Sequence, residues 1–125
     1  MKIRKIKQTD ITECTKILKK AYGFHPYNEF FKGISARLYT EGKYKNCKKH
    51  SFVAVDEKNK LIAFIFLNIS AWSEGLQVVL EEIVVSPKLQ GRGIGKKLMQ
   101  HAHDYLHSLE IKSVMLWTKK RCAIN

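Results

Sequence analysis

The stretch EEIVVSPKLQGRGIGKKL, from Glu81 to Leu98, carries the strongest structural signal in the sequence. It reads as an apolar strand that runs into a glycine-rich turn at the start of a helix. The first N–H groups of a helix have no partner within it, and the helix dipole places partial positive charge there. A phosphate binds well in that position, and Arg92, Lys96 and Lys97 would add charge-assisted donors. The stretch therefore predicts a phosphate-binding site.

The spacing of the glycines narrows the kind of phosphate ligand. Gly91, Gly93 and Gly95 give G-x-G-x-G, whereas the dinucleotide fingerprint is G-x-G-x-x-G and has a glycine where this chain has Lys96. The loop of nucleoside triphosphatases needs Gly-Lys-Ser/Thr after four spacers, which this segment lacks. The alternative is a turn that only tightens the junction between strand and helix. The flanking strand, helix and basic residues make that alternative the weaker one.

The rest of the sequence predicts one domain over residues 1–125 with the element order βααβββαβ, an α+β fold built as a mixed α/β sandwich. Apolar residues at helical spacing and apolar runs bounded by turn residues locate the elements. We expect helices over 11–23, 26–39 and 91–109, and strands over 1–7, 51–55, 61–71, 76–85 and 112–118. Thr9 or Asp10 would cap the first helix with Glu13 as its capping-box partner.

The second predicted helix, over 26–39, would carry its apolar residues on one side. Those residues are Phe30, Phe31, Ile34 and Leu38. The segment that follows, Glu41 to His50, is polar and rich in lysine, and we expect it to be a loop.

The net charge is +12, from 23 Lys and Arg against 11 Asp and Glu. Such a charge favours polyanionic partners: nucleic acid, an anionic membrane or a ligand rich in phosphate. A well-solvated lysine surface explains it equally well. We see neither the aromatic-and-basic strand motif of an RNA-binding sheet nor a helix-turn-helix pattern, so nucleic acid is the weaker reading.

Cys14, Cys47 and Cys122 are few, odd in number and widely spaced, which is typical of free thiols in a reducing compartment. They form no ligand pattern with histidine, so we expect no metal. The N-terminal residues lack the apolar core of a signal peptide, and no apolar run approaches the roughly 18 residues of a membrane span. We therefore expect a cytoplasmic protein that does not enter a membrane.

Gln90, Gly93 and Gly95 match the fixed positions of Q/R-x-x-G-x-G/A, and this segment resembles the acyl-CoA-binding motif of the GCN5-related N-acetyltransferase (GNAT) superfamily. The preceding LEEIVVSPKL resembles the fourth strand of that family, and the element order resembles its first eight elements. The resemblance covers essentially the whole chain. It implies a GNAT-like acyl-CoA N-acyltransferase fold and an enzyme that moves the acetyl group of acetyl-CoA to a primary amine, on a small molecule or a peptide.

The resemblance also implies which residues hold the cofactor. The backbone of the strand would pair with the pantetheine arm, and the loop would hold the pyrophosphate. The residues implied are Ile83, Val84 and Val85 in the strand and Gln90, Gly91, Arg92, Gly93, Ile94, Gly95 and Lys96 in the loop.

Glu81 and Glu82 are the candidates for the base that deprotonates the amine. Being adjacent on a strand, they are expected to point to opposite faces. Family members often place the base nine or eleven residues before the motif's glutamine, where this chain has Glu81 and Val79; we favour Glu81, with Glu82 second. In the alternative, one glutamate binds the cationic acceptor and the other pairs with a surface lysine.

The acceptor side gives a looser match. AYGFHPYNEFF and SAWSEG resemble the branch of the superfamily that contains aminoglycoside 6'-N-acetyltransferase-like enzymes. That match implies an acceptor site with Phe24, Tyr27, Trp72 and Glu74, and aromatic and acidic residues suit a cationic amine. The alternative is that Phe24, Tyr27 and Phe30 belong to the helix core.

The family's later segment, with the tyrosine that protonates the CoA thiolate, has no counterpart before Asn125. The fold is therefore expected to be C-terminally truncated, with an open sheet edge near Val114, Leu116 and Trp117 that favours a homodimer. The missing segment also keeps an alternative function open: a non-catalytic CoA-binding module or a basic nucleic-acid-binding module.

Overall fold

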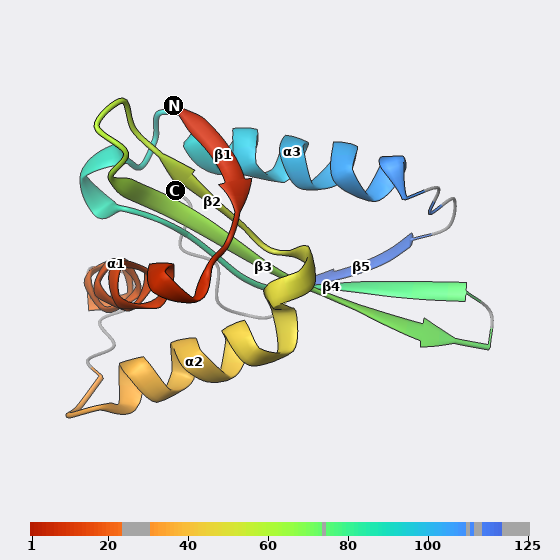
Figure 1. The fold of residues 1–125 in the computed structure, drawn as a ribbon, viewed down its shortest axis with the longest axis horizontal. Helices are drawn as coiled ribbons and strands as arrows, with labels where there is room; N and C mark the ends of the chain where they lie inside the picture. The colour runs from red at the N-terminus through yellow and green to blue at the C-terminus, as the bar shows by residue number, and fades with distance from the viewer. Residues whose placement is uncertain (24–30, 74, 110, 112–113, 119–125) are drawn as a thin grey trace.

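The structure is a computed structural model that describes residues 1–23, 31–73, 75–109, 111 and 114–118. In these residues five strands form one sheet with helices on both faces (Figure 1), which confirms the predicted fold class and element order. The elements in chain order are β1 (Lys2–Lys5), α1 (Ile11–Gly23), α2 (Ser35–Cys47), β2 (Phe52–Val55), β3 (Leu61–Trp72), β4 (Gly75–Val85), α3 (Ile94–Ser108) and β5 (Val114–Thr118).

The strands follow one another in the sheet in sequence order. Neighbours from β1 to β4 are antiparallel, and β5 is parallel to β4. The crossover that joins parallel strands is long, and α3 lies within it. Within the described sheet β1 and β5 are the outer strands, so homodimerisation at the β5 edge stays a prediction.

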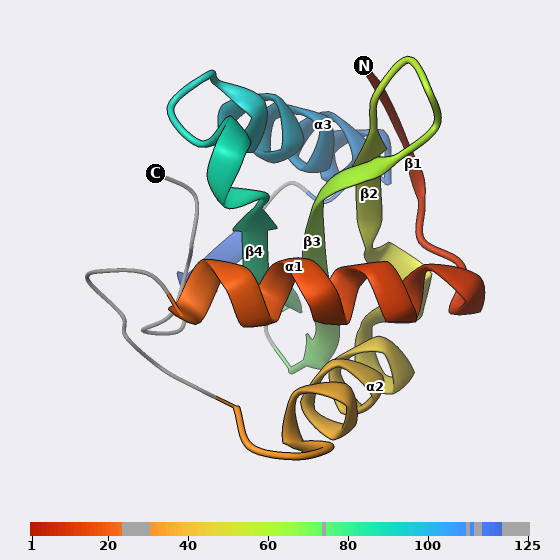
Figure 2. The ribbon, with the colours of Figure 1, turned by 90° about the vertical axis from the view of Figure 1, so that its left-hand side faces the viewer.

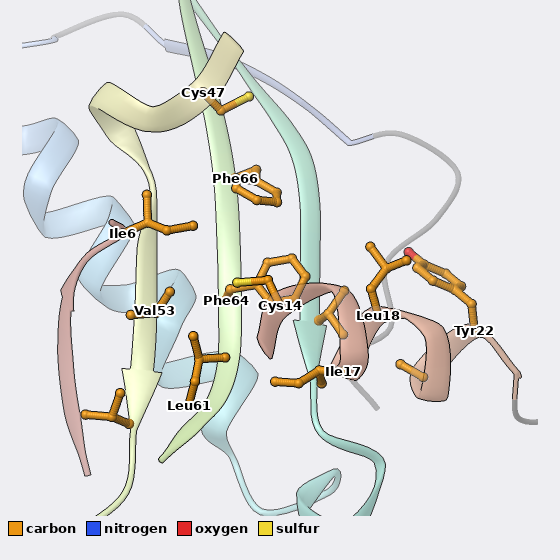
Figure 3. Packing of buried hydrophobic residues seen from close by; sticks show 13 residues of the cluster. Ile6, Cys14, Ile17, Leu18, Tyr22, Cys47, Val53, Leu61, Phe64 and Phe66 are labelled. Carbon is orange, nitrogen blue, oxygen red and sulfur yellow. The ribbon is translucent and has the colours of Figure 1, made fainter. Parts of the chain in front are cut away.

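The helices divide the core into two layers. Helices α1 and α2 cover one face of the sheet and α3 covers the other (Figures 1 and 2). Figure 3 shows the α1 side, where Leu18 and Tyr22 of the helix belong to one buried cluster with Phe64 and Phe66 of β3. On the α3 side Leu98, Ala102 and Leu106 pack on the opposite face of β2, β3 and β4. Successive side chains of β3 point alternately into these two layers. Because a shift by one residue would exchange the two sets, this alternation fixes the register of β3 with β4.

Helix α2 lies later in the chain than predicted, and the lysine-rich segment expected to be a loop is mostly helix. It buries small side chains, Ala36, Thr40 and Cys47, while Ile34 and Leu38 are 71% and 58% exposed. Phe31 packs against the core as predicted, and Tyr39 and Tyr44 of the helix pack there as well. The packed side of α2 therefore combines small residues with partly buried aromatic ones, and this weak hydrophobic pattern is why the sequence misplaced the helix.

The start of α1 also differs from the prediction. A 3-10 turn, Gln8–Asp10, precedes the helix, and the Asp10 carboxylate accepts the Lys7 N–H at 2.7 Å. The two Nη atoms of Arg4 donate to the same carboxylate at 2.8 and 2.9 Å. The expected capping partner, Glu13, instead forms a surface ion pair at 3.2 Å with the lysine one turn further along the helix.

Candidate active site

The segment between β4 and α3, coloured cyan in Figure 1, forms the glycine-rich loop. A 3-10 turn, Pro87–Leu89, leads into it, and α3 begins at Ile94, three residues later than predicted. Gly91 and Gly93 have φ of +80° and +81°, a left-handed conformation that favours glycine. A Cβ added at either position would meet no other atom, so the backbone conformation is what requires glycine here.

The first turn of α3 presents free donors beside this loop. In the described part of the chain the N–H groups of Ile94, Gly95 and Lys96 have no backbone carbonyl as partner. The next N–H, that of Lys97, closes the first helical bond, onto the Gly93 carbonyl at 3.0 Å. The side chains of Arg92, Lys96 and Lys97 are exposed. Donors, dipole and positive charge together make this a site that suits a phosphate.

Gln90 has a contact that the sequence did not reveal. Its Nε2 donates to the carbonyl of Val85 at 3.0 Å, and its own N–H reaches the Pro87 carbonyl at 3.4 Å. The side chain therefore ties the loop to the end of β4. The glutamine of the motif shapes the loop here.

One edge of β4 adjoins this loop and is only partly paired. β5 pairs with β4 over Leu76 to Leu80, and no described strand lies beyond that point along residues 81–85. Ile83 and Val85 are buried toward α3, and Val84 is buried toward α1. The edge of this part of β4 therefore exposes backbone N–H and C=O groups. An extended ligand can pair with them as an added strand.

The prediction that Glu81 and Glu82 point to opposite faces is wrong, because β4 contains a bulge. In the register of β3 with β4, Phe66 faces Glu82 and Leu67 faces Leu80, so Glu81 is an extra residue. Leu80 packs toward α3, whereas both carboxylates contact α2 on the opposite face. The bulge thus places two acidic side chains next to each other.

Glu82 is fully buried and joins three elements. Its carboxylate accepts hydrogen bonds from the hydroxyl of Tyr22 on α1 and from the hydroxyl of Tyr39 on α2, the latter at 2.6 Å. A buried carboxylate needs such donors, because transfer out of water is costly without them. Glu82 is thus enclosed by protein.

Glu81 is more accessible and has a cationic partner. Its Oε1 accepts a hydrogen bond from Lys43 Nζ at 2.6 Å, and the two side chains are 12% and 18% exposed. Lys43 and Tyr39 lie one turn apart on α2, so one side of this helix contacts both carboxylates. Sequence reasoning missed both α2 residues, because it ended the second helix at Tyr39 and placed Lys43 in a loop.

The acceptor residues lie mostly outside the described residues. Phe24, Tyr27 and Glu74 are among those not described, and Trp72 ends β3 with its side chain likewise not described. Within the described ranges, no three His, Cys, Asp or Glu side chains come close enough to hold a metal ion. None of the described helices has the length and apolar character to cross a membrane. Cys14 and Cys47 are buried, and burial raises the pKa of the Cys14 thiol.

Comparison with known proteins agrees with this arrangement. Residues 12–121 match the family model described as the acetyltransferase (GNAT) family, and the chain belongs to that family. The match spans the helical layer, the bulged strand and the glycine loop, and it confirms the resemblance seen in the motif.

Three similar proteins illustrate the range of the family. A streptothricin acetyltransferase from Streptomyces lavendulae is 38% identical over 61 residues, which cover 49% of this chain and 31% of that protein. The chain thus spans about a third of that curated relative. A crystal structure from Pyrococcus horikoshii is 28% identical, with a TM-score of 0.71 over 92% of this chain and 76% of that one. A GNAT family acetyltransferase from Brucella melitensis, solved with acetyl-CoA, is 20% identical, with a TM-score of 0.69 over 92% and 73%.

Proposed function

We propose that residues 1–125 form one acetyltransferase domain that moves the acetyl group of acetyl-CoA to a primary amine. The observation that carries the proposal is the junction of β4 and α3, where left-handed glycines, unpartnered helix N–H groups and three cationic side chains adjoin an open strand edge. Family membership supports the same reading. A reducing, cytoplasmic location belongs to the same proposal, because a thiol such as that of Cys14 stays reduced there.

Cofactor binding follows from this junction. The N–H groups of residues 91–96 and the side chains of Arg92 and Lys96 would hold the pyrophosphate, as a helix start holds other phosphates. The backbone of Ile83, Val84 and Val85 would pair with the extended pantetheine arm. That pairing brings the thioester along β4 toward the bulge, because the strand leads from the loop directly to Glu81.

Chemistry at the bulge then requires a base. An amine attacks a thioester only when it is neutral, so a carboxylate must first take a proton from the ammonium ion. Glu81 is the better candidate, since Glu82 is enclosed by two tyrosines and fully buried. Glu81 pairs with Lys43 at 2.6 Å, so the ammonium of an external acceptor has to displace Lys43 from this carboxylate.

The acceptor itself is a cationic amine in this proposal. Phe24, Tyr27, Trp72 and Glu74 remain the residues that we expect around it, since aromatic and acidic side chains attract cations. The likeness to a streptothricin acetyltransferase supports including streptothricin among the first acceptors to test. Aminoglycosides, polyamines and short peptides complete the panel.

The test measures thiol release from acetyl-CoA with each amine, for the wild type and for Glu81→Gln. We expect at least one amine to be turned over, and Glu81→Gln to lower kcat about 100-fold or more at neutral pH, as loss of a general base does. CoA affinity should change less than threefold. Glu41→Gln is the matched control, because Glu41 is an exposed acid of α2 that pairs with Arg37.

Two results would count against the proposal. Thiol release that no amine stimulates would remove the transferase activity. An unchanged kcat in Glu81→Gln would remove Glu81 as the base while leaving cofactor binding in place.

A further inference from the structure

We propose that Lys43 is a modification site, a lysine that the protein acetylates on itself with Glu81 as the base. The inference rests on the proposed function, because it uses the same acetyl donor and the same carboxylate. It extends that function from an external amine to an amine within the chain. Beyond the proposed acetyl-CoA site, it needs only residues of the bulge and α2.

The geometry of Lys43 is that of a nucleophile beside its base. The Nζ atom lies 2.6 Å from Glu81 Oε1, within the distance over which a general base takes a proton. Lys43 also lies over the ring of Tyr39, with Nζ 5.5 Å from the ring centroid. That ring is itself fixed, since the Tyr39 hydroxyl donates to the buried Glu82. The amine is therefore held at the bulge by two independent contacts.

The elements around Lys43 favour reaction within one molecule. The side chain of Lys43 is 18% exposed and that of Glu81 is 12% exposed. A second protein molecule would therefore have difficulty bringing its own active site to Lys43. The proposed thioester position lies on the same strand, at the bulge itself. A fixed amine, a base in contact with it and a donor bound alongside are the parts that intramolecular transfer needs.

The step balances as follows. Glu81 takes one proton from the Lys43 ammonium and leaves a neutral amine. The nitrogen lone pair forms a bond to the acetyl carbon, and the carbon–sulfur bond breaks with its electron pair on sulfur. The nitrogen then loses a second proton, which ends on the CoA thiolate, and Glu81 releases the first proton to solvent. The products are acetyl-lysine, CoA thiol and one proton.

Acetylation would alter the site that performs it. It removes the positive charge of Lys43 and with it the ion pair to Glu81. The carboxylate then no longer has this lysine as its cationic partner and can accept the ammonium of an external acceptor. We therefore expect the modified protein to have a lower KM for cationic amines than the protein before modification.

The experiment incubates the full chain with acetyl-CoA alone and follows each lysine by peptide mass spectrometry. Lys45 is the internal reference, because it lies on the same helix and is exposed to solvent. We expect Lys43 to be acetylated at least tenfold faster than Lys45, at a rate per molecule independent of protein concentration. In Glu81→Gln the rate at Lys43 should fall at least tenfold while that at Lys45 is unchanged.

The outcomes separate this inference from the proposed function. If external amines are acetylated but Lys43 reacts no faster than Lys45, the inference is overturned and the proposed function stands. Equal Lys43 rates in the wild type and Glu81→Gln would also overturn it, since chemical acetylation needs no base. If neither external amines nor Lys43 react, both fail. Lys43→Arg serves as the check on site assignment: the modified peptide must disappear.

Discussion

Asp10 shows how a single side chain fixes the junction between β1 and α1. It accepts three hydrogen bonds, two from Arg4 and one from the Lys7 N–H, and its side chain is 9% exposed. Burial alone would raise the pKa of the carboxyl group, but the bonds from Arg4 and Lys7 outweigh it, and the pKa lies below its ordinary value. A pKa lowered by folding stabilises the fold above the unfolded-state pKa, and that stabilisation is lost as the pH falls through the folded-state pKa.

The first prediction at this scale is therefore a pH-dependent loss of stability in Asp10→Asn. At pH 7 we expect the free energy of unfolding to fall by about 1.5–3 kcal/mol, the usual range for hydrogen bonds to a charged group. Urea denaturation measures the free energy of unfolding at pH 7 and at about pH 3, which is below the unfolded-state aspartate pKa of about 3.9. The difference in this free energy between wild type and Asp10→Asn should be smaller at the lower pH. A gap of the same size at both pH values would contradict it.

A matched control for this prediction lies on α3. Asp104 is an exposed aspartate that contacts Gln100 and His103 of its own helix. Asp104→Asn should stay within about 0.5 kcal/mol of wild type at both pH values, as surface substitutions do.

The glycine-rich loop is the part of the candidate site whose conformation the sequence predicted best, although α3 begins three residues later than expected. Gly91 and Gly93 are found in the conformation that favours glycine, and α3 begins directly after them. The sequence succeeded here because the signal is local: one strand, one turn and one helix start. The side-chain bond of Gln90 to Val85 could not be predicted, since it depends on how the turn folds back.

At the scale of elements, the sequence-based prediction failed where the packing of an element differs from what its hydrophobic pattern indicates. Helix α2 gives a weak hydrophobic pattern. Because the segment before it is rich in aromatic residues, the predicted helix lay too far toward the N-terminus. The bulge in β4 was not predicted, because it arises from the pairing of β4 with β3 and the sequence of one strand does not reveal that pairing. Both errors concern the same part of the site, and together they hid the contacts of α2 with the two glutamates.

The prediction at this scale concerns Glu82 as the link between β4, α1 and α2. Replacing it with alanine removes an acceptor shared by the Tyr22 and Tyr39 hydroxyls and leaves a space in a closed layer. We expect Glu82→Ala to lower the free energy of unfolding by about 2–4 kcal/mol. Tyr39→Phe should cost about 1–2 kcal/mol, because one bond is lost and the ring remains. Urea denaturation measures both.

Glu13→Ala is the comparison for Glu82→Ala. Glu13 is exposed and forms an ion pair with Lys16 on the surface of α1, so its loss should cost about 0.5 kcal/mol or less. If Glu82→Ala proves no more destabilising than Glu13→Ala, the link between the three elements does not contribute to stability.

On the scale of the whole molecule, β4 brings the glycine-rich loop and the bulge into one line. β4 starts beside β5, passes the bulge at Glu81 and ends at the loop that opens α3 (Figure 1). Helices α1 and α2 lie over the bulge from one face, and α3 supports the strand from the other (Figure 2). A ligand extended along the end of β4 would thus reach both the phosphate site and the carboxylate.

The central claim is that the loop between β4 and α3 binds the pyrophosphate of CoA, and a calorimetric titration with CoA tests it most directly. Wild type should bind CoA, and Gly93→Ala should bind about tenfold or more weakly, because alanine is strained at φ +81° by about 1–3 kcal/mol. Gly42→Ala, a mid-helix glycine of α2 with open space around it, should bind like wild type. No binding heat with wild type, or equal affinity in Gly93→Ala, would contradict the account.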